Sequence, residues 1–242
     1  MFLNKKVVIF DMDGTLIDSV GIWNKTDEIL IRKLSNNYEV KPENIQQLRD
    51  SILAQCKSQD IYLEYCDYLK QKYNSSMKAG DILKLRWEIS NEYIEQQIDY
   101  KPNADILLHL LKENGYILAL ATTTTNIQLN AYKNINKNII QKANINEIFD
   151  IVLSKEDVKE KKPSPEIHNK ILQILNAKTS DCLIIEDSLI GVQAGVNAGI
   201  EVAVIYDKYS DCDRAEINRL SQYQFNSFEE IINKVKAELN LI

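Results

Sequence analysis

Two carboxylates stand two positions apart at the end of the first apolar run, in the stretch Phe10-Asp11-Met12-Asp13-Gly14-Thr15. Acidic side chains held this close raise each other's pKa unless a cation lies between them. A bound divalent ion therefore accounts for Asp11 and Asp13, and Gly14 would let the chain turn sharply away from that ion. An ordinary Asp-Gly turn after an edge strand explains this stretch alone about as well.

Three later stretches carry side chains that suit the same chemistry. In chain order they offer Thr122 and Thr123, then Lys162, then Glu186 and Asp187. Mg²⁺ prefers a few carboxylates together with water and a phosphate oxygen. A lysine and a threonine hydroxyl suit the remaining phosphoryl oxygens, one as a charge and the other as a donor. The combination of residue types predicts a metal-assisted phosphoryl-transfer site.

Each of these residues also has a purely structural explanation. Thr122 alone is typical of a hydroxyl at the end of a strand. Lys161 and Lys162 lie in a charged run, residues 155–162, of the kind that usually forms a solvated face. The acidic pair at 186–187 can stabilise the start of the following helix through its charge. Only the four stretches together favour a catalytic site.

Short apolar runs precede these polar residues and predict the elements that position them. Residues 6–10 are too short for a helix and rich in β-branched and aromatic side chains, which favours a buried parallel strand. Further strands are expected at 116–121, 150–153, 182–185 and 202–206, and helices at 103–114, 127–143, 166–175 and 190–198. Ser227 and Glu230 predict a capping box that opens a last helix ending at Leu239.

This alternation predicts an α/β fold, with a Rossmann-like, mostly parallel sheet and helices on both of its faces. Ligands bind such sheets outside the carboxyl ends of the strands, where the polar residues above would converge. Residues 18–98 differ, because their apolar residues follow helical spacing and no strand pattern interrupts them. We expect an all-α insert of about four helices in a core made of residues 1–17 and 99–242.

Composition narrows the class of protein. The 242 residues are 45% hydrophobic with a formal net charge of −6, which is typical of a soluble domain and argues against a nucleic-acid partner. Neither a signal peptide nor a membrane-spanning stretch is expected, so the predicted location is the cytoplasm. The four cysteines lack Cys-x-x-Cys spacing, which indicates reduced thiols. A monomer or weak dimer is expected.

In order and spacing, the motifs resemble those of the haloacid dehalogenase superfamily, in the branch with a helical cap inserted after the first motif. The matching motifs are Asp11-Met12-Asp13-Gly14-Thr15, Thr122, Lys162-Pro163-Ser164-Pro165, and the stretch from Glu186 to Gly199. The resemblance implies a Mg²⁺-dependent phosphohydrolase acting on a small phosphorylated metabolite. It leaves two alternatives: a sugar phosphomutase of the β-phosphoglucomutase type, and a non-catalytic relative that binds a phosphorylated ligand.

The resemblance also implies residue roles. Asp11 would be the nucleophile that forms an aspartyl-phosphate, and Asp13 would be the general acid and then the general base. Thr122, Thr123 and Lys162 would hold the phosphoryl oxygens. Lys161 stands where many members have glycine, and we expect Lys162 to be the lysine that faces the site.

The implied Mg²⁺ ligands are Asp11, the backbone carbonyl of Asp13, and Asp187, with Glu186 nearby, bound directly or through water. Dehalogenases of the superfamily lack the second aspartate, so the presence of Asp13 favours phosphate chemistry.

Two features of the insert bear on the substrate and on the reaction. The loop at 54–59 resembles the specificity loop of such caps, so Lys57 and Ser58 would contact a second polar group of the substrate; a solvated helix turn explains them equally well. Sugar-phosphate mutases of this branch carry a histidine ten residues after the acid/base aspartate, and this chain has Trp23 there. An indole has one donor and no acceptor, so we expect Trp23 to pack the cap or line the site, and the enzyme to hydrolyse its substrate.

Overall fold

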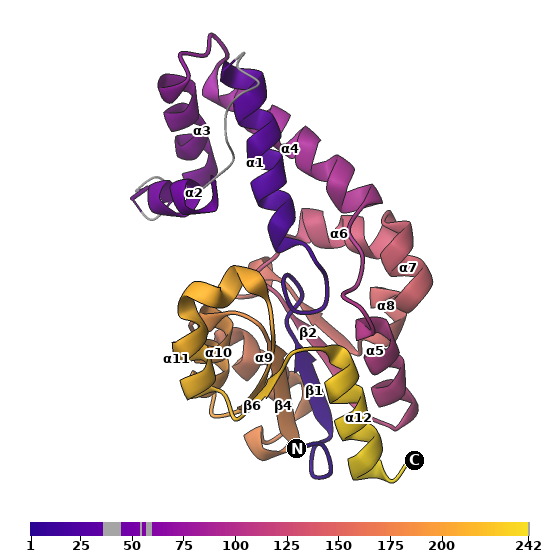
Figure 1. Cartoon of the computed structure of the whole chain (residues 1–242). Coiled ribbons are helices and arrows are strands. Elements are labelled where there is room, and N and C mark those ends of the chain that lie inside the picture. Colours follow the sequence, from indigo (N-terminus) through magenta and orange to yellow (C-terminus); the bar gives the residue numbers. More distant parts are fainter. Residues whose placement is uncertain (36–44, 54, 57–59, 242) are drawn as a thin grey trace. The chain divides into compact units, whose positions relative to one another are not determined.

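The computed structural model describes residues 1–35, 45–53, 55–56 and 60–241 and divides into two compact units. One unit comprises Met1–Asp18 and Ile98–Ile242, and the other comprises Ser19–Gln97 (Figure 1). Within the described residues, no helix has the length and apolar character needed to cross a bilayer. The four cysteines all lie in this part of the chain and carry free thiols.

The larger unit is built on a parallel sheet, and the predicted α/β Rossmann-like fold is confirmed. Within the described residues the sheet has six strands in the order β3-β2-β1-β4-β5-β6. The strands are β1 (Val7–Phe10), β2 (Ile117–Ala121), β3 (Ile151–Leu153), β4 (Cys182–Glu186), β5 (Glu201–Ile205) and β6 (Tyr223–Phe225). Strand β1 is central and pairs with β2 through Val7 and Ile117 and with β4 through Val7 and Cys182. Both faces of β1 are buried, as its continuous apolar run requires.

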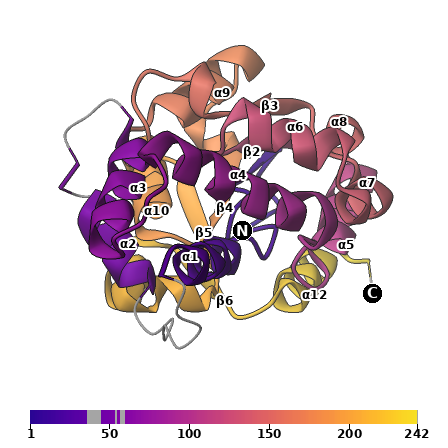
Figure 2. The ribbon, with the colours of Figure 1, turned by 90° about the horizontal axis from the view of Figure 1, so that it is seen from above.

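Helices cover both faces of this sheet. Helices α9 (Glu166–Leu175), α10 (Leu189–Asn197) and α11 (Arg214–Leu220) contribute to one apolar cluster with alternate residues of β1, β2, β4 and β5. Helices α5 (Ala104–Glu113) and α12 (Phe228–Leu239) contact each other and lie on the opposite face (Figure 1, Figure 2). The 3₁₀ turns η1 (Lys155–Asp157), η2 (Thr179–Asp181) and η3 (Lys208–Asp213) complete the connections.

Two local expectations need correction. The helical segment expected at 127–143 is split into α6 (Asn126–Asn134) and α7 (Lys137–Ala143), followed by α8 (Ile145–Ile148). The break occurs because the Asn136 side chain accepts the Ile139 N–H and so starts a new helix. The capping box of α12 is half formed: the Ser227 hydroxyl accepts the Glu230 N–H, but Glu230 bonds the N–H of Asn226 instead of that of Ser227.

The smaller unit contains α1 (Val20–Ser35), α2 (Ile45–Leu53), α3 (Ile61–Lys72) and α4 (Ala79–Gln96). Its described part has an apolar core that includes Leu30, Tyr65 and Ile82, and also one buried ionic group. Asp27 is fully buried and accepts hydrogen bonds from Arg86 Nε at 2.7 Å and Arg49 Nη1 at 3.1 Å. Since an uncompensated buried charge is costly, this group ties α1, α2 and α4 together.

The chain leaves the larger unit and returns to it through two segments that are hydrogen-bonded to each other. Ile17 and Tyr100 form an antiparallel bridge, flanked by bonds from Lys101 N to Leu16 O at 2.8 Å and from Asp18 N to Asp99 O at 3.2 Å. This crossover ladder starts directly after the motif that carries Asp11 and Asp13.

Candidate active site

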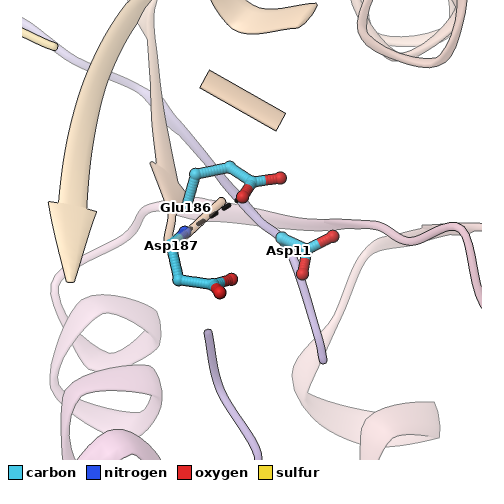
Figure 3. A group of neighbouring side chains, drawn as sticks. All are labelled: Asp11, Glu186 and Asp187. Atoms are coloured by element: carbon cyan, nitrogen blue, oxygen red, sulfur yellow. Dashed lines mark hydrogen bonds between the residues drawn. The ribbon is translucent and has the colours of Figure 1, made fainter. Parts of the chain in front are cut away.

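The ends of β1 and β4 bring three carboxylates together. Asp11 directly follows β1 and its N–H bonds the carbonyl of Ile185 at 3.0 Å, while Glu186 ends β4 and Asp187 follows it. One oxygen from each of the three carboxylates lies within 4.8 Å of the others, and all three residues are buried (Figure 3). The strand order reverses at β1, which is where sheets of this type bind ligands.

Lys162 supplies a positive charge to this cluster. Its Nζ donates to Asp11 Oδ1 at 2.7 Å, to Glu186 Oε1 at 2.6 Å and to the carbonyl of Ala121 at 2.9 Å. Burial alone would lower the pKa of this lysine, but Asp11 and Glu186 raise it above its usual range. The neighbouring Lys161 is exposed. Of the two lysines, the structure therefore places Lys162 among the carboxylates.

One lysine does not balance three carboxylates. Burial raises the pKa of Asp11 to about 7, against the opposing effect of Lys162 and with a further contribution from Glu186. Burial also raises the pKa of Asp187, aided by Glu186 and Asp11 and opposed by a hydrogen bond from Thr15 and by the charge of Lys101. Buried acidic groups with raised pKa values and oxygen atoms this close together suit a hard divalent cation.

Glu186 already has partners on both carboxylate oxygens. Oε1 accepts from Lys162, and Oε2 accepts from the N–H of Asp187 at 2.9 Å, the N–H of Ser188 at 3.1 Å and the Ser188 hydroxyl at 3.1 Å. The carboxylate occupies the space beside Gly191, where a Cβ would lie 1.8 Å from Oε1. The glycine in α10 therefore makes room for Glu186.

Asp187 is held by two hydroxyl groups. Thr15 Oγ1 donates to Oδ1 at 2.7 Å, and Ser210 Oγ lies 3.5 Å from Oδ2. Neither residue is among those that the sequence predicts for the site. Thr15 lies within the first motif, so its position was available as a signal. Ser210 comes from η3, and nothing in its sequence context indicates that it reaches Asp187.

The threonine loop after β2 lies next to Asp13. The Thr124 hydroxyl is hydrogen-bonded to Asp13 Oδ2, and the N–H of Thr124 donates to Thr122 Oγ1 at 3.0 Å. Thr122 is buried at the strand end, whereas Thr123 is exposed. Thr124, which sequence reasoning passed over, is thus the threonine that contacts the second aspartate.

Of the residues predicted in the insert, the structure describes Trp23 but neither Lys57 nor Ser58. Trp23 lies on α1 of the smaller unit, where its ring meets that of Trp87 edge to face at 6.1 Å and the Arg86 guanidinium stacks over it at 5.0 Å. Trp23 thus packs within its own unit.

Comparison with known proteins identifies the family. The model of the haloacid dehalogenase-like hydrolases matches residues 8–205. A phosphoglycolate phosphatase from Aquifex aeolicus is 26% identical over 206 residues, which cover 82% of this chain and 84% of the relative. Among solved structures, YfnB from Bacillus subtilis bound to magnesium is 15% identical with a TM-score of 0.72, over 96% of this chain and 99% of that one.

The β-phosphoglucomutase from Clostridium difficile is 18% identical with a TM-score of 0.64, over 98% of this chain and 97% of that one. At such identities the two structures establish the fold alone. The family match covers most of the chain and confirms both the expected superfamily and the expectation of an enzyme. This chain belongs to the haloacid dehalogenase-like hydrolases.

Proposed function

We propose that this protein is a Mg²⁺-dependent phosphohydrolase that acts on a small phosphorylated metabolite through an aspartyl-phosphate on Asp11. The observation that carries the proposal is the contact of Lys162 Nζ with both Asp11 Oδ1 and Glu186 Oε1 at the ends of β1 and β4. A buried ammonium group beside a buried aspartate suits the binding of a phosphoryl group next to its nucleophile. The phosphatase among the relatives supports this assignment.

In the proposed reaction, a carboxylate oxygen of Asp11 attacks phosphorus and the bond from phosphorus to the leaving oxygen breaks. Asp13 gives its proton to that oxygen, and the alcohol departs. Asp13 then takes a proton from water, whose oxygen attacks the same phosphorus and releases Asp11 and inorganic phosphate. Lys162 and the hydroxyl of Thr122 hold the phosphoryl oxygens during both steps, together with the backbone and side chain of Thr123.

The donor set fits a magnesium ion, because it consists of oxygen atoms from buried carboxylates. Asp11 and Asp187 would hold it with the backbone carbonyl of Asp13, and Glu186 would support the site through Lys162 and Asp187. When bound, the ion neutralises the negative charge of the phosphoryl group. Magnesium bound to the structural neighbour YfnB supports this choice.

Release of phosphate to water is proposed instead of mutase activity because of Trp23. The resemblance implies a histidine at this position in sugar-phosphate mutases. The Trp23 ring instead contacts Trp87 and Arg86. An indole does not titrate near neutral pH, so it cannot form a hydrogen bond that responds to protonation as that of a histidine does. Residues 18–98 are proposed to act as a cap domain that selects the leaving group, with residues 1–17 and 99–242 as the catalytic core.

Activity against a generic aryl phosphate, measured with Mg²⁺ and after exhaustive chelation, tests the metal-dependent reaction. We expect turnover with Mg²⁺ and little without it. Unchanged activity after chelation would refute the metal assignment, and no activity on any phosphate ester would favour a non-catalytic relative. A panel of phosphorylated metabolites, beginning with sugar phosphates and nucleotides, then defines the substrate.

A separate assay decides between hydrolase and mutase. The enzyme is incubated with β-glucose 1-phosphate and a trace of the bisphosphate, and both products are followed. If this substrate reacts, we expect inorganic phosphate and little glucose 6-phosphate. Rapid stoichiometric formation of glucose 6-phosphate without phosphate release would reverse the choice.

A further inference from the structure

Asp187 depends on a segment that lies outside the family motifs. The turn η3 follows β5 and brings Ser210 Oγ to 3.5 Å from Asp187 Oδ2. Ser210 is itself buried, at 9% exposure. The position of this hydroxyl is set by whatever fixes η3, because a 3₁₀ turn of six residues has little stability of its own.

Asp207 fixes the start of η3. Its Oδ1 accepts the N–H of Tyr209 at 2.8 Å, and its backbone carbonyl accepts the N–H of Ser210 at 3.1 Å and a guanidinium N–H of Arg214 at 2.7 Å. Its remaining oxygen, Oδ2, accepts from Lys101 Nζ at 2.6 Å. The Lys101 ammonium also lies 3.4 Å from the carbonyl of Tyr206.

The ion pair between Lys101 and Asp207 is well shielded from water. The Lys101 side chain is 13% exposed and that of Asp207 is 5% exposed, so their interaction is screened less than that of a surface pair. Loss of one partner would leave the other charge largely buried and without compensation. The pair is therefore positioned to hold η3 against the rest of the unit.

Lys101 also belongs to the crossover ladder, because its backbone N–H donates a hydrogen bond to Leu16 O at 2.8 Å. Leu16 directly follows Thr15, whose hydroxyl holds the other oxygen of Asp187 at 2.7 Å. Asp187 is thus supported from two sides by one ladder. Thr15 directly precedes one segment of the ladder and contacts Asp187 itself, whereas the other segment supplies Lys101, which acts through Asp207, η3 and Ser210.

We propose that Lys101 and Asp207 form a positioning pair that holds the Asp187 carboxylate in the orientation needed to bind the metal. The inference rests on the proposed function, in which Asp187 is a Mg²⁺ ligand. Residues that orient a metal ligand typically contribute about 10- to 100-fold to metal affinity. Because this pair acts through η3 and one long hydrogen bond, we expect an effect of about tenfold.

The test is calorimetric titration of the purified full-length protein with Mg²⁺ alone. Lys101→Met removes the charge and keeps a long side chain. The matched control is Lys112→Met, which breaks the ion pair of 2.7 Å between Lys112 and Asp150 in the same unit and changes the net charge equally. We expect Lys101→Met to raise the Mg²⁺ dissociation constant about tenfold relative to Lys112→Met, and Lys101→Arg to restore most of the affinity.

Two further variants provide a test that does not depend on whether Lys101→Met folds. Asp207→Asn should weaken Mg²⁺ binding by a similar factor, and the double variant with Lys101→Met should be little weaker than either single one. Ser210→Ala leaves the ion pair intact and should also weaken binding. Thermal melts in chelator show whether each variant is folded.

The outcomes separate this inference from the proposed function. If the unsubstituted protein binds Mg²⁺ and the Lys101, Asp207 and Ser210 variants bind it as tightly as Lys112→Met, the positioning pair is refuted and the metal site stands. If the unsubstituted protein binds no Mg²⁺, both the metal assignment and this inference are wrong.

Discussion

In the proposed reaction, the Asp11 side chain is phosphorylated and then released by hydrolysis. Asparagine has the same shape but cannot form the aspartyl-phosphate, so Asp11→Asn should lower turnover by at least about 10³-fold. The matched control is Asp81→Asn, at an exposed position in the first turn of α4, which should leave turnover unchanged. Initial rates with an aryl phosphate measure both. A folded Asp11→Asn protein with most of its activity would refute covalent catalysis by Asp11.

His168 illustrates a residue whose burial has a cost. It is fully buried on α9, and neither ring nitrogen has a hydrogen-bond partner within the described part of the chain. Burial lowers its pKa to about 3, and the charge of Lys162 acts in the same direction. The imidazole is therefore neutral in the folded protein near neutral pH.

We predict that His168→Leu stabilises the protein by up to about 1 kcal/mol near neutral pH, because it removes two unpaired polar atoms. A folded-state pKa below the unfolded value of about 6.5 means that the unfolded chain takes up the proton first. The native histidine thus destabilises the fold increasingly as pH falls from 6.5 towards 3, by about 1.4 kcal/mol per pH unit. Urea unfolding at pH 7.5 and 5 measures the difference between the two proteins. The same difference in unfolding free energy between the two proteins at both pH values would contradict the prediction.

At the level of elements, the central strands could be predicted from sequence because a strand buried on both faces needs a continuous apolar run. Strand β1 meets this condition in full and β4 meets it up to Glu186, and every residue of both strands is buried. Strand β6 has three residues with an exposed Gln224 in the middle, so no apolar run predicted it. The split between α6 and α7 depends on which asparagine side chain turns back to cap, and many asparagines in that segment could have done so.

The site shows the same distinction. The acidic residues and Lys162 could be predicted because each belongs to a recognisable motif. Ser210 and the pair of Asp207 and Lys101 could not, because they come together only through the path of the chain after β5 and through the crossover ladder. Such contacts leave no spacing signature in the sequence.

Helix α10 offers a test of how an element shapes the site. Close packing on the sheet is one reason for glycines in such a helix. Gly195 fits that explanation, since a Cβ there would lie 2.6 Å from Val202. Gly191 faces the Glu186 carboxylate instead, so Gly191→Ala must displace the group that holds Lys162. We predict a fall in turnover of about 10- to 100-fold and a loss of about 1–3 kcal/mol in unfolding free energy.

The control for Gly191→Ala is Gly80→Ala in the first turn of α4, where an added Cβ would meet no atom within 4 Å. This change should raise the unfolding free energy by about 0.5 kcal/mol through reduced backbone freedom in the unfolded chain, with turnover unchanged. Aryl phosphate kinetics and urea unfolding on both variants decide the matter. Normal turnover in Gly191→Ala would show that Glu186 tolerates displacement.

For the molecule as a whole, the concentration of negative charge at the sheet edge matters more than the formal net charge of −6. Net charge governs solubility and association, whereas buried charges change the free energy of folding directly. Three buried carboxylates against one lysine should make the metal-free protein less stable than the metal-bound one. The direction in which the stability of the metal-free protein changes with pH tests this imbalance of charge.

Asp11 has a folded-state pKa of about 7 against an ordinary value of 3.8, so its proton binds the folded protein more tightly than the unfolded chain. The metal-free protein therefore gains stability from this group as pH falls below 7 and loses it as pH rises through 7. Asp11→Asn lacks the effect, and the contribution of His168 is common to both proteins and cancels in their difference. In chelator, the advantage of Asp11→Asn over the native protein should thus grow by about 1.4 kcal/mol between pH 6 and pH 8.

Saturating Mg²⁺ should reverse this order at pH 8, because an ion that binds only the folded state stabilises it and the native protein keeps the ligand that the variant has lost. Urea unfolding of the two proteins at pH 6 and 8, with chelator and with Mg²⁺, measures all four differences. A constant difference across pH in chelator would mean that Asp11 is ionised without its metal, with Lys162 alone compensating its charge. An unchanged order in Mg²⁺ would mean that the ion binds elsewhere than between Asp11 and Asp187.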